Sequence, residues 1–158
     1  MTLHREAAPY FCVPHILPPS DPKDPGQGND RSRAIENLRV LIVEDEFFIS
    51  LDMKAMLAAM GHAVVGVAVS AETAVALAER ERPDVVLMDI RLIGVRDGID
   101  AAREILARFG IRSIFVTANT DPDTRKRASR ALPIDFLEKP LTEQRLRAAL
   151  ASGSYNKD

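Results

Sequence analysis

The sequence lacks the features that mark several large classes of protein. It has one cysteine, Cys12, so no internal disulfide can form, and no cluster of cysteine and histidine suggests a zinc site. No apolar run reaches the roughly 18 residues that a membrane-spanning helix needs, and the N-terminus lacks the pattern of a secretory signal. The formal net charge of −2 gives no electrostatic case for nucleic acid as a partner. These absences favour a soluble, cytoplasmic protein with neither a membrane nor a nucleic-acid partner.

The N-terminal residues differ in character from the rest of the chain. They contain the run PPSDPKDPGQGNDRSR, which has no hydrophobic periodicity and is typical of a segment that buries too little apolar surface to fold. We expect a mostly disordered tail over residues 1–37, a folded domain over 38–152 and a short C-terminal tail over 153–158. The one apolar island of the N-terminal tail, YFCVPHIL, is either a stretch that docks loosely or a partner-binding segment.

From residue 38 onward, apolar strand-like runs alternate with helical patterns. Strands are predicted over residues 39–43, 63–69, 84–88, 112–116 and 134–137, and helices over 46–60, 71–81, 99–109, 121–132 and 143–150. Because strands with unbroken apolar runs are buried on both faces, the sheet should be parallel with helices on each side. Right-handed crossovers then predict a doubly wound, five-stranded α/β fold. His62, just after a predicted helix end, is expected to be exposed.

Polar side chains stand at the carboxyl ends of the predicted strands, where ligands bind in such sheets. Glu44 and Asp45 follow the first strand, Asp89 the third, Thr117 the fourth and Lys139 the fifth. Three carboxylates in a small volume repel one another unless a cation lies among them, and Mg²⁺ prefers carboxylate oxygens with room for water. A carboxylate can also act as a nucleophile and form an acyl phosphate. Together with a lysine and a hydroxyl, the set predicts phosphoryl transfer.

At these residues the chain resembles the receiver domains of two-component response regulators, over residues 38–150. The resembling pieces are VLIVEDE, VVLMDI, DGI, IFVTA and FLEKP, in this order and each at the expected strand end. The resemblance implies a flavodoxin-like sheet with strand order 2-1-3-4-5 and five helices. It implies that Asp89 is the phosphoacceptor and that Mg²⁺ is held by Glu44 (through water), Asp45, Asp89 and the backbone carbonyl of Arg91.

The same resemblance implies roles for residues around the acceptor. Thr117 would contact the phosphoryl oxygens, and Lys139 would form an ion pair with them. The Lys139–Pro140 peptide bond would be cis. Phe136 would be the switch aromatic, whose ring follows the threonine inward on phosphorylation.

Two further positions would tune self-dephosphorylation in this family. Arg91 stands two residues beyond Asp89, and Asn119 two residues beyond Thr117. Arg91 could act by pairing with Glu44 or by reaching the phosphoryl group.

The resemblance predicts a stand-alone phosphoacceptor switch that receives its phosphoryl group from a sensor histidine kinase or a phosphotransfer protein. Only ASGSYNKD follows Leu150, so we expect no DNA-binding or catalytic output domain and no activity beyond slow self-phosphorylation and self-dephosphorylation. Output would pass through protein–protein contact at the fourth helix, fifth strand and fifth helix, to an acidic partner or a homodimer mate. The fourth helix carries Arg125, Lys126, Arg127 and Arg130, a basic run that is otherwise a solvated face.

Two alternatives stay open. One is an interaction module that works without phosphorylation. The other is a Mg²⁺-dependent phosphatase that forms an aspartyl phosphate, which would need Asp-x-Asp at the end of the first strand, where the chain has Glu44-Asp45-Glu46-Phe47.

Overall fold

The computed structural model describes residues 37–118 and 121–155, so the predicted N-terminal tail lies outside the described residues except for Asn37. Strands and helices alternate through the described part: β1 (Arg39–Val43), α1 (Phe47–Ala59), β2 (Ala63–Ala68), α2 (Ala71–Glu81), β3 (Val85–Met88), α3 (Gly98–Phe109), β4 (Ser113–Thr117), α4 (Pro122–Ser129), β5 (Asp135–Glu138) and α5 (Glu143–Ser152). All ten predicted elements are therefore confirmed. No helix in these two ranges has the length and apolarity needed to cross a bilayer.

The largest difference from the predicted boundaries is at the end of α4. The helix was expected to continue to residue 132 but ends at Ser129. The amides of Arg130, Ala131 and Leu132 bond to carbonyls only three residues back, and Leu132 has a φ of 47°. Such tightening closes a helix, and Pro133 disfavours helical backbone in the residue before it.

The strands form one parallel sheet in the order β2-β1-β3-β4-β5, which confirms the predicted fold. The chain leaves β1 toward β2 on one side, and β3 joins β1 on the other. The carboxyl ends of β1 and β3 therefore form the point at which the strand order reverses, where doubly wound sheets bind their ligands.

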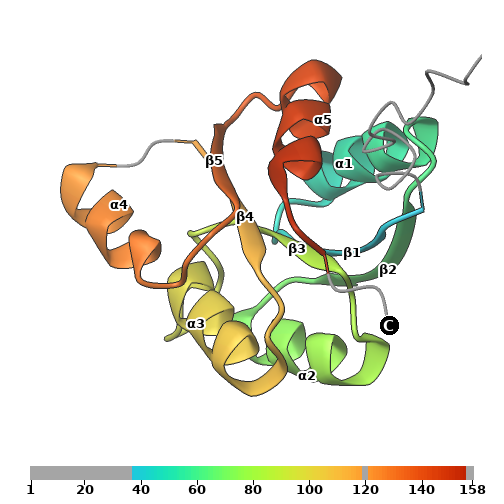
Figure 1. The fold of residues 1–158 in the computed structure, drawn as a ribbon. Helices are drawn as coiled ribbons and strands as arrows, with labels where there is room; N and C mark the ends of the chain where they lie inside the picture. Colours follow the sequence, from blue (N-terminus) through green and yellow to red (C-terminus); the bar gives the residue numbers. More distant parts are fainter. Residues whose placement is uncertain (1–36, 119–120, 156–158) are drawn as a thin grey trace, which may run out of the picture.

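Helices cover both faces of this sheet, with α1 and α5 on one side and α2 and α3 on the other (Figure 1). Alternate side chains of β1 supply the two layers, because Leu41 and Val43 pack toward α2 and α3 while Val40 and Ile42 pack toward α1 and α5. All four are fully buried. The sheet is thus a rigid support for the groups at its carboxyl edge.

Two residues at the opposite edge of the sheet are more buried than the sequence indicates. The prediction that His62 is exposed is wrong: it is 8% exposed, and its Nδ1 accepts a hydrogen bond from the Leu38 amide at 3.3 Å. Because β2 lies directly beside β1, His62, which immediately precedes β2, faces Leu38, which immediately precedes β1. Tyr155, in the segment predicted as a C-terminal tail, packs against the α1 and α5 side and donates its hydroxyl to the Leu150 carbonyl at 2.7 Å.

Candidate functional site

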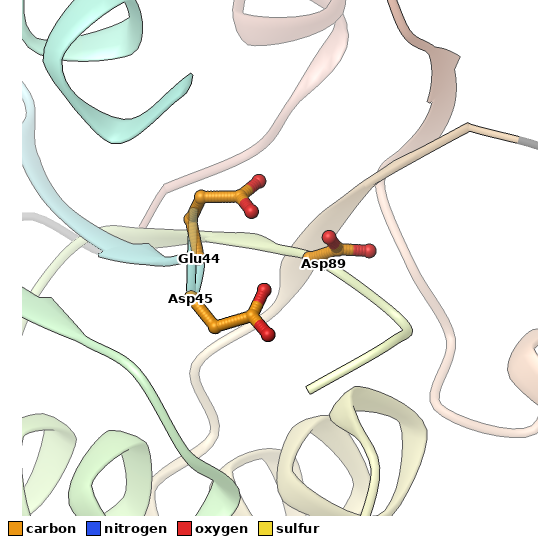
Figure 2. A group of neighbouring side chains, drawn as sticks. All are labelled: Glu44, Asp45 and Asp89. Carbon is orange, nitrogen blue, oxygen red and sulfur yellow. The ribbon is translucent and has the colours of Figure 1, made fainter. Parts of the chain in front are cut away.

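Three carboxylates meet at the carboxyl ends of β1 and β3 (Figure 2). Val43 pairs with Met88 in the parallel register, so the residues that follow the two strands emerge side by side. The Asp89 amide also donates to the Val43 carbonyl at 2.9 Å, which ties the end of β3 to the end of β1. One oxygen each from Glu44, Asp45 and Asp89 lies within 4.8 Å of the others. The three carboxylates that we expected at one edge of the sheet are therefore brought together.

Lys139 reaches this cluster from the turn after β5. Its Nζ lies 2.6 Å from Glu44 Oε2 and 2.7 Å from Asp89 Oδ2. The backbone of the turn is held by the Lys139 amide, which donates to the Thr117 carbonyl at 2.9 Å. The Lys139–Pro140 bond is cis, as predicted. One ammonium group thus forms ion pairs with two of the three carboxylates.

The electrostatics of the cluster reflect its burial. The side chain of Glu44 is fully buried and that of Lys139 is 12% exposed. Burial raises the pKa of Glu44, and repulsion from Asp89 adds to the rise, against the opposing effects of Lys139 and the Glu46 amide. Burial alone would lower the pKa of Lys139, but the neighbouring carboxylates of Asp89 and Glu44 hold it above its usual value. The site therefore favours added positive charge, whether from a proton or from a cation.

The donor set fits a hard divalent cation. Glu44 Oε2 is buried and has no hydrogen bond, because its short contact with Lys139 Nζ is not aligned as one. Asp45 is partly exposed and makes no hydrogen bond or ion pair through its side chain within the described part of the chain. Oxygen atoms with unused lone pairs, some facing water, are what Mg²⁺ requires. The part that the Arg91 carbonyl would play in such a site stays a prediction.

Arg91 and Thr117 border the cluster in different ways. The Arg91 amide donates to Asp89 Oδ1 at 3.1 Å, which fixes the rotation of the carboxylate. The Arg91 side chain is exposed and forms no ion pair with any described residue, so Glu44 pairs with Lys139 instead. Thr117 is 2% exposed at the end of β4. Asn119 lies outside the described residues.

Phe136 lies in β5, where it pairs with Phe115 of β4 in the parallel register, and is partly buried. Its ring stacks on that of Phe115 in β4, with centroids 5.4 Å apart and an interplanar angle of 24°. The guanidinium of Arg125, on α4, lies 4.7 Å from the centroid of the Phe136 ring. The ring is thus held between an aromatic neighbour in the sheet and a cation on a helix.

Three residues near the acceptor loop were given no individual role by the sequence. Asp97 caps α3, Gly98 begins that helix directly against the Asp89 backbone, and Arg127 on α4 pairs with Asp97. The Asp97-Gly98 pair before a helical pattern is itself a signal for a cap. The ion pair between Arg127 and Asp97 joins residues 30 positions apart, so no local sequence pattern predicts it.

Comparison with known proteins agrees with this geometry. A sequence profile of the response regulator receiver domain matches residues 40–151. The transcriptional regulatory protein PdtaR of Mycobacterium tuberculosis is 39% identical over 117 residues, which cover 74% of this chain and 56% of PdtaR. Protein PilH of Pseudomonas aeruginosa is 36% identical over 111 residues, which cover 68% of this chain and 90% of PilH. This chain spans about half the length of the first curated relatives that it matches.

A solved structure shows the same architecture. The signal receiver domain of a modulated diguanylate cyclase from Desulfovibrio desulfuricans superposes with a TM-score of 0.69 at 35% identity. The match covers 73% of this chain and 91% of that domain. Sequence and fold therefore point to one family.

Proposed function

The chain belongs to the response regulator receiver domain family, and on that premise we propose that it is a phosphoacceptor switch in which Asp89 receives a phosphoryl group. The donor would be a phosphohistidine of a sensor kinase or of a phosphotransfer protein. An Asp89 carboxylate oxygen would bond to phosphorus as the P–N bond breaks, and the leaving imidazole nitrogen would keep the electron pair. In this proposal the chain itself catalyses only slow self-phosphorylation and self-dephosphorylation.

The observation that carries this proposal is the position of the Asp89 carboxylate. It stands at the end of a buried strand, with Oδ1 held by the Arg91 amide and Oδ2 held 2.7 Å from Lys139 Nζ. Such fixed geometry supports in-line attack, because phosphoryl transfer depends on positioning and on charge neutralisation. Lys139 would then pair with the phosphoryl oxygens, and the Thr117 hydroxyl would donate to them.

Mg²⁺ is the cofactor that we propose for this site. Glu44, Asp45 and Asp89 would hold it, with the backbone carbonyl of Arg91 as a further ligand. When bound, the ion would neutralise charge on the transferring group. The charge balance supports this assignment, because the single ammonium group of Lys139 faces three carboxylates and leaves Asp45 without an ion pair among the described residues.

We also propose that Phe136 is the switch and that Arg91 and Asn119 tune the lifetime of the phosphoryl group. The stacking of Phe136 on Phe115 gives the ring a defined position from which it can move. The exposed Arg91 side chain has no competing ion pair in the described ranges and is free to approach a phosphoryl group on Asp89.

The output surface in this proposal is the face of α4, β5 and α5, in which β5 lies between the two helices (Figure 1). The exposed Lys126 and Arg130 favour an acidic partner or a second copy of the chain. Light scattering tests the second-copy version: dimers that form on phosphorylation and are lost in Lys126→Glu/Arg130→Glu would support it. A phosphorylated protein that stays monomeric would leave a different, acidic protein as the partner.

Incubation with Mg²⁺ and acetyl phosphate, followed by intact-mass measurement, tests the central proposal. The wild type should gain one phosphoryl group and Asp89→Asn none. Asp84→Asn is the matched control, because Asp84 lies just before the other end of the same strand and should leave labelling unchanged. Labelling should also fail in EDTA.

Three results would contradict the proposal. An unlabelled wild type, or equal labelling of wild type and Asp89→Asn, would exclude Asp89 as the acceptor. Sustained release of phosphate from phosphate esters would instead favour a phosphatase.

A further inference from the structure

Helix α4 has little apolar attachment to the rest of the molecule. Of its residues Pro122–Ser129, only Ala128 is buried, and an alanine side chain removes little surface from water. The position of α4 must therefore depend on other contacts. Two arginines of this helix provide them, and they reach in different directions because residues two positions apart do not share a helix face.

The first contact joins α4 to the start of α3. Arg127 donates through its guanidinium to Oδ2 of Asp97. The other oxygen of the same carboxylate, Oδ1, accepts hydrogen bonds from the amides of Ile99 at 3.0 Å and Asp100 at 3.1 Å. One carboxylate thus caps α3 and binds α4 at the same time.

The residue after Asp97 is in direct contact with the acceptor loop. Gly98 donates its amide to the Ile90 carbonyl at 2.9 Å. A β-carbon at this position would collide with the Asp89 carbonyl oxygen and lie 2.9 Å from its carbonyl carbon. Because there is no clearance between Gly98 and Asp89, a shift of the Asp89 backbone must carry the start of α3, and Asp97 with it.

The second contact, from Arg125 to the ring of Phe136, joins α4 to β5 at 4.7 Å. This contact does not involve the loop after β3. Among the described residues, the ion pair between Arg127 and Asp97 is the charged contact that links α4 to that loop. Asp97 and Arg127 line a cavity of about 330 Å³ together with Arg91. The region around this ion pair is therefore open and can rearrange.

We propose that Asp97 is a positioning residue: its ion pair with Arg127 latches α4 to the loop that carries Asp89, so that the position of α4 and the state of Asp89 are coupled. Breaking the latch loosens α4. Reciprocally, a phosphoryl group on Asp89 loosens the latch, since the shift at Asp89 passes through Gly98 to Asp97. This second half rests on the proposed function, whereas the first does not.

Amide hydrogen exchange across residues 122–129 of the unphosphorylated protein tests the latch directly. Asp97→Asn keeps the helix cap, since asparagine caps as well as aspartate, but cannot pair with Arg127. Because Arg127 and Asp97 side chains are 47% and 28% exposed, we expect exchange about two- to fivefold faster in Asp97→Asn and in Arg127→Gln. Arg127→Lys, which keeps the charge, should recover part of the protection.

The double variant and a matched control sharpen this test. Asp97→Asn/Arg127→Gln should exchange no faster than either single variant, since both remove the same contact. Arg147→Gln, which breaks an exposed ion pair with Glu143 on α5, should leave the exchange of α4 unchanged. Wild-type exchange in both single variants, or additive effects in the double, would overturn the latch.

The coupling is tested by repeating the measurement after labelling with Mg²⁺ and acetyl phosphate. In the wild type, phosphorylation should speed exchange in α4, and in Asp97→Asn the added effect should shrink toward none. The phosphoryl group should also have a different lifetime in Asp97→Asn than in wild type. A labelled protein whose α4 exchange stays unchanged would overturn the coupling while the proposed function stands. Failure of labelling would overturn the proposed function, and the unphosphorylated exchange data would still decide the latch.

Discussion

Asp45→Asn gives the sharpest test of the carboxylate cluster, because it should change the stability of the protein in opposite directions with and without Mg²⁺. Lys139 contacts Glu44 and Asp89 but no ion pair forms at Asp45 within the described residues. Asp45 is therefore the carboxylate whose repulsion is least compensated. Asparagine has nearly the same shape and removes only the charge.

The size of the effect follows from the separation of the charges. At 4.8 Å, the upper limit of the separation between the three carboxylate oxygens, two unit charges repel by about 0.9 kcal/mol in water and by about 3.5 kcal/mol at an effective dielectric constant of 20. Because Asp45 is partly exposed and Lys139 offsets its neighbours, we expect a value near the lower limit. In EDTA, Asp45→Asn should raise the free energy of unfolding by about 1 kcal/mol, or about 4 °C in melting temperature.

Mg²⁺ should reverse the order of the two proteins. At a concentration one hundred times its dissociation constant, the ion stabilises the wild type by about 2.7 kcal/mol. If loss of the Asp45 carboxylate weakens binding about a hundredfold, the variant gains only about 0.4 kcal/mol at the same concentration. The wild type should then be the more stable protein.

Thermal unfolding followed by circular dichroism, in EDTA and along a Mg²⁺ titration, measures both effects. Asp52→Asn is the control, because Asp52 is an exposed residue of α1; it should stay within about 0.5 kcal/mol of wild type and respond fully to Mg²⁺. An Asp45→Asn protein less stable than wild type in EDTA would refute the repulsion. An equal gain from Mg²⁺ in both proteins would refute the metal site.

Three further predictions concern the site and its neighbours. In EDTA, the free energy of unfolding should fall as pH rises from 4.5, the ordinary pKa of Glu44, through its raised folded pKa, because the folded state there holds a proton that the unfolded state has released. Glu44→Gln should flatten this slope in urea titrations at several pH values; an unchanged slope would assign it to another group. Gly98→Ala should lower the free energy of unfolding by about 2 kcal/mol through its collision with Asp89, whereas helix propensity alone predicts a gain of about 1 kcal/mol, so urea unfolding separates the two. Arg125→Ala should cost about 0.5–1 kcal/mol by uncovering the Phe136 ring, with a smaller loss in Arg125→Lys; a wild-type urea midpoint would show that the contact contributes nothing.

Local sequence patterns were enough to predict most of the fold. Unbroken apolar runs in β1 and β3 predicted buried parallel strands, and capping residues such as Ser70 and Asp97 stand where α2 and α3 begin. The early end of α4 was missed because the periodicity continues beyond it, while Leu132 takes a left-handed backbone that the pattern does not reveal. His62 was misjudged because its burial depends on the return of β2 beside β1.

The sequence by itself determined which chemical groups share an edge of the molecule. Once the strands are known to be parallel, their carboxyl ends must lie together, so Glu44, Asp45 and Asp89 were predictable as a cluster. Only the tertiary structure decided how these groups and their neighbours pair. The partners Lys139 and Asp89 stand 50 residues apart, and Arg127 and Asp97 stand 30 apart. Such pairs depend on the packing of separate elements and on side-chain rotamers, which no periodicity along the chain encodes.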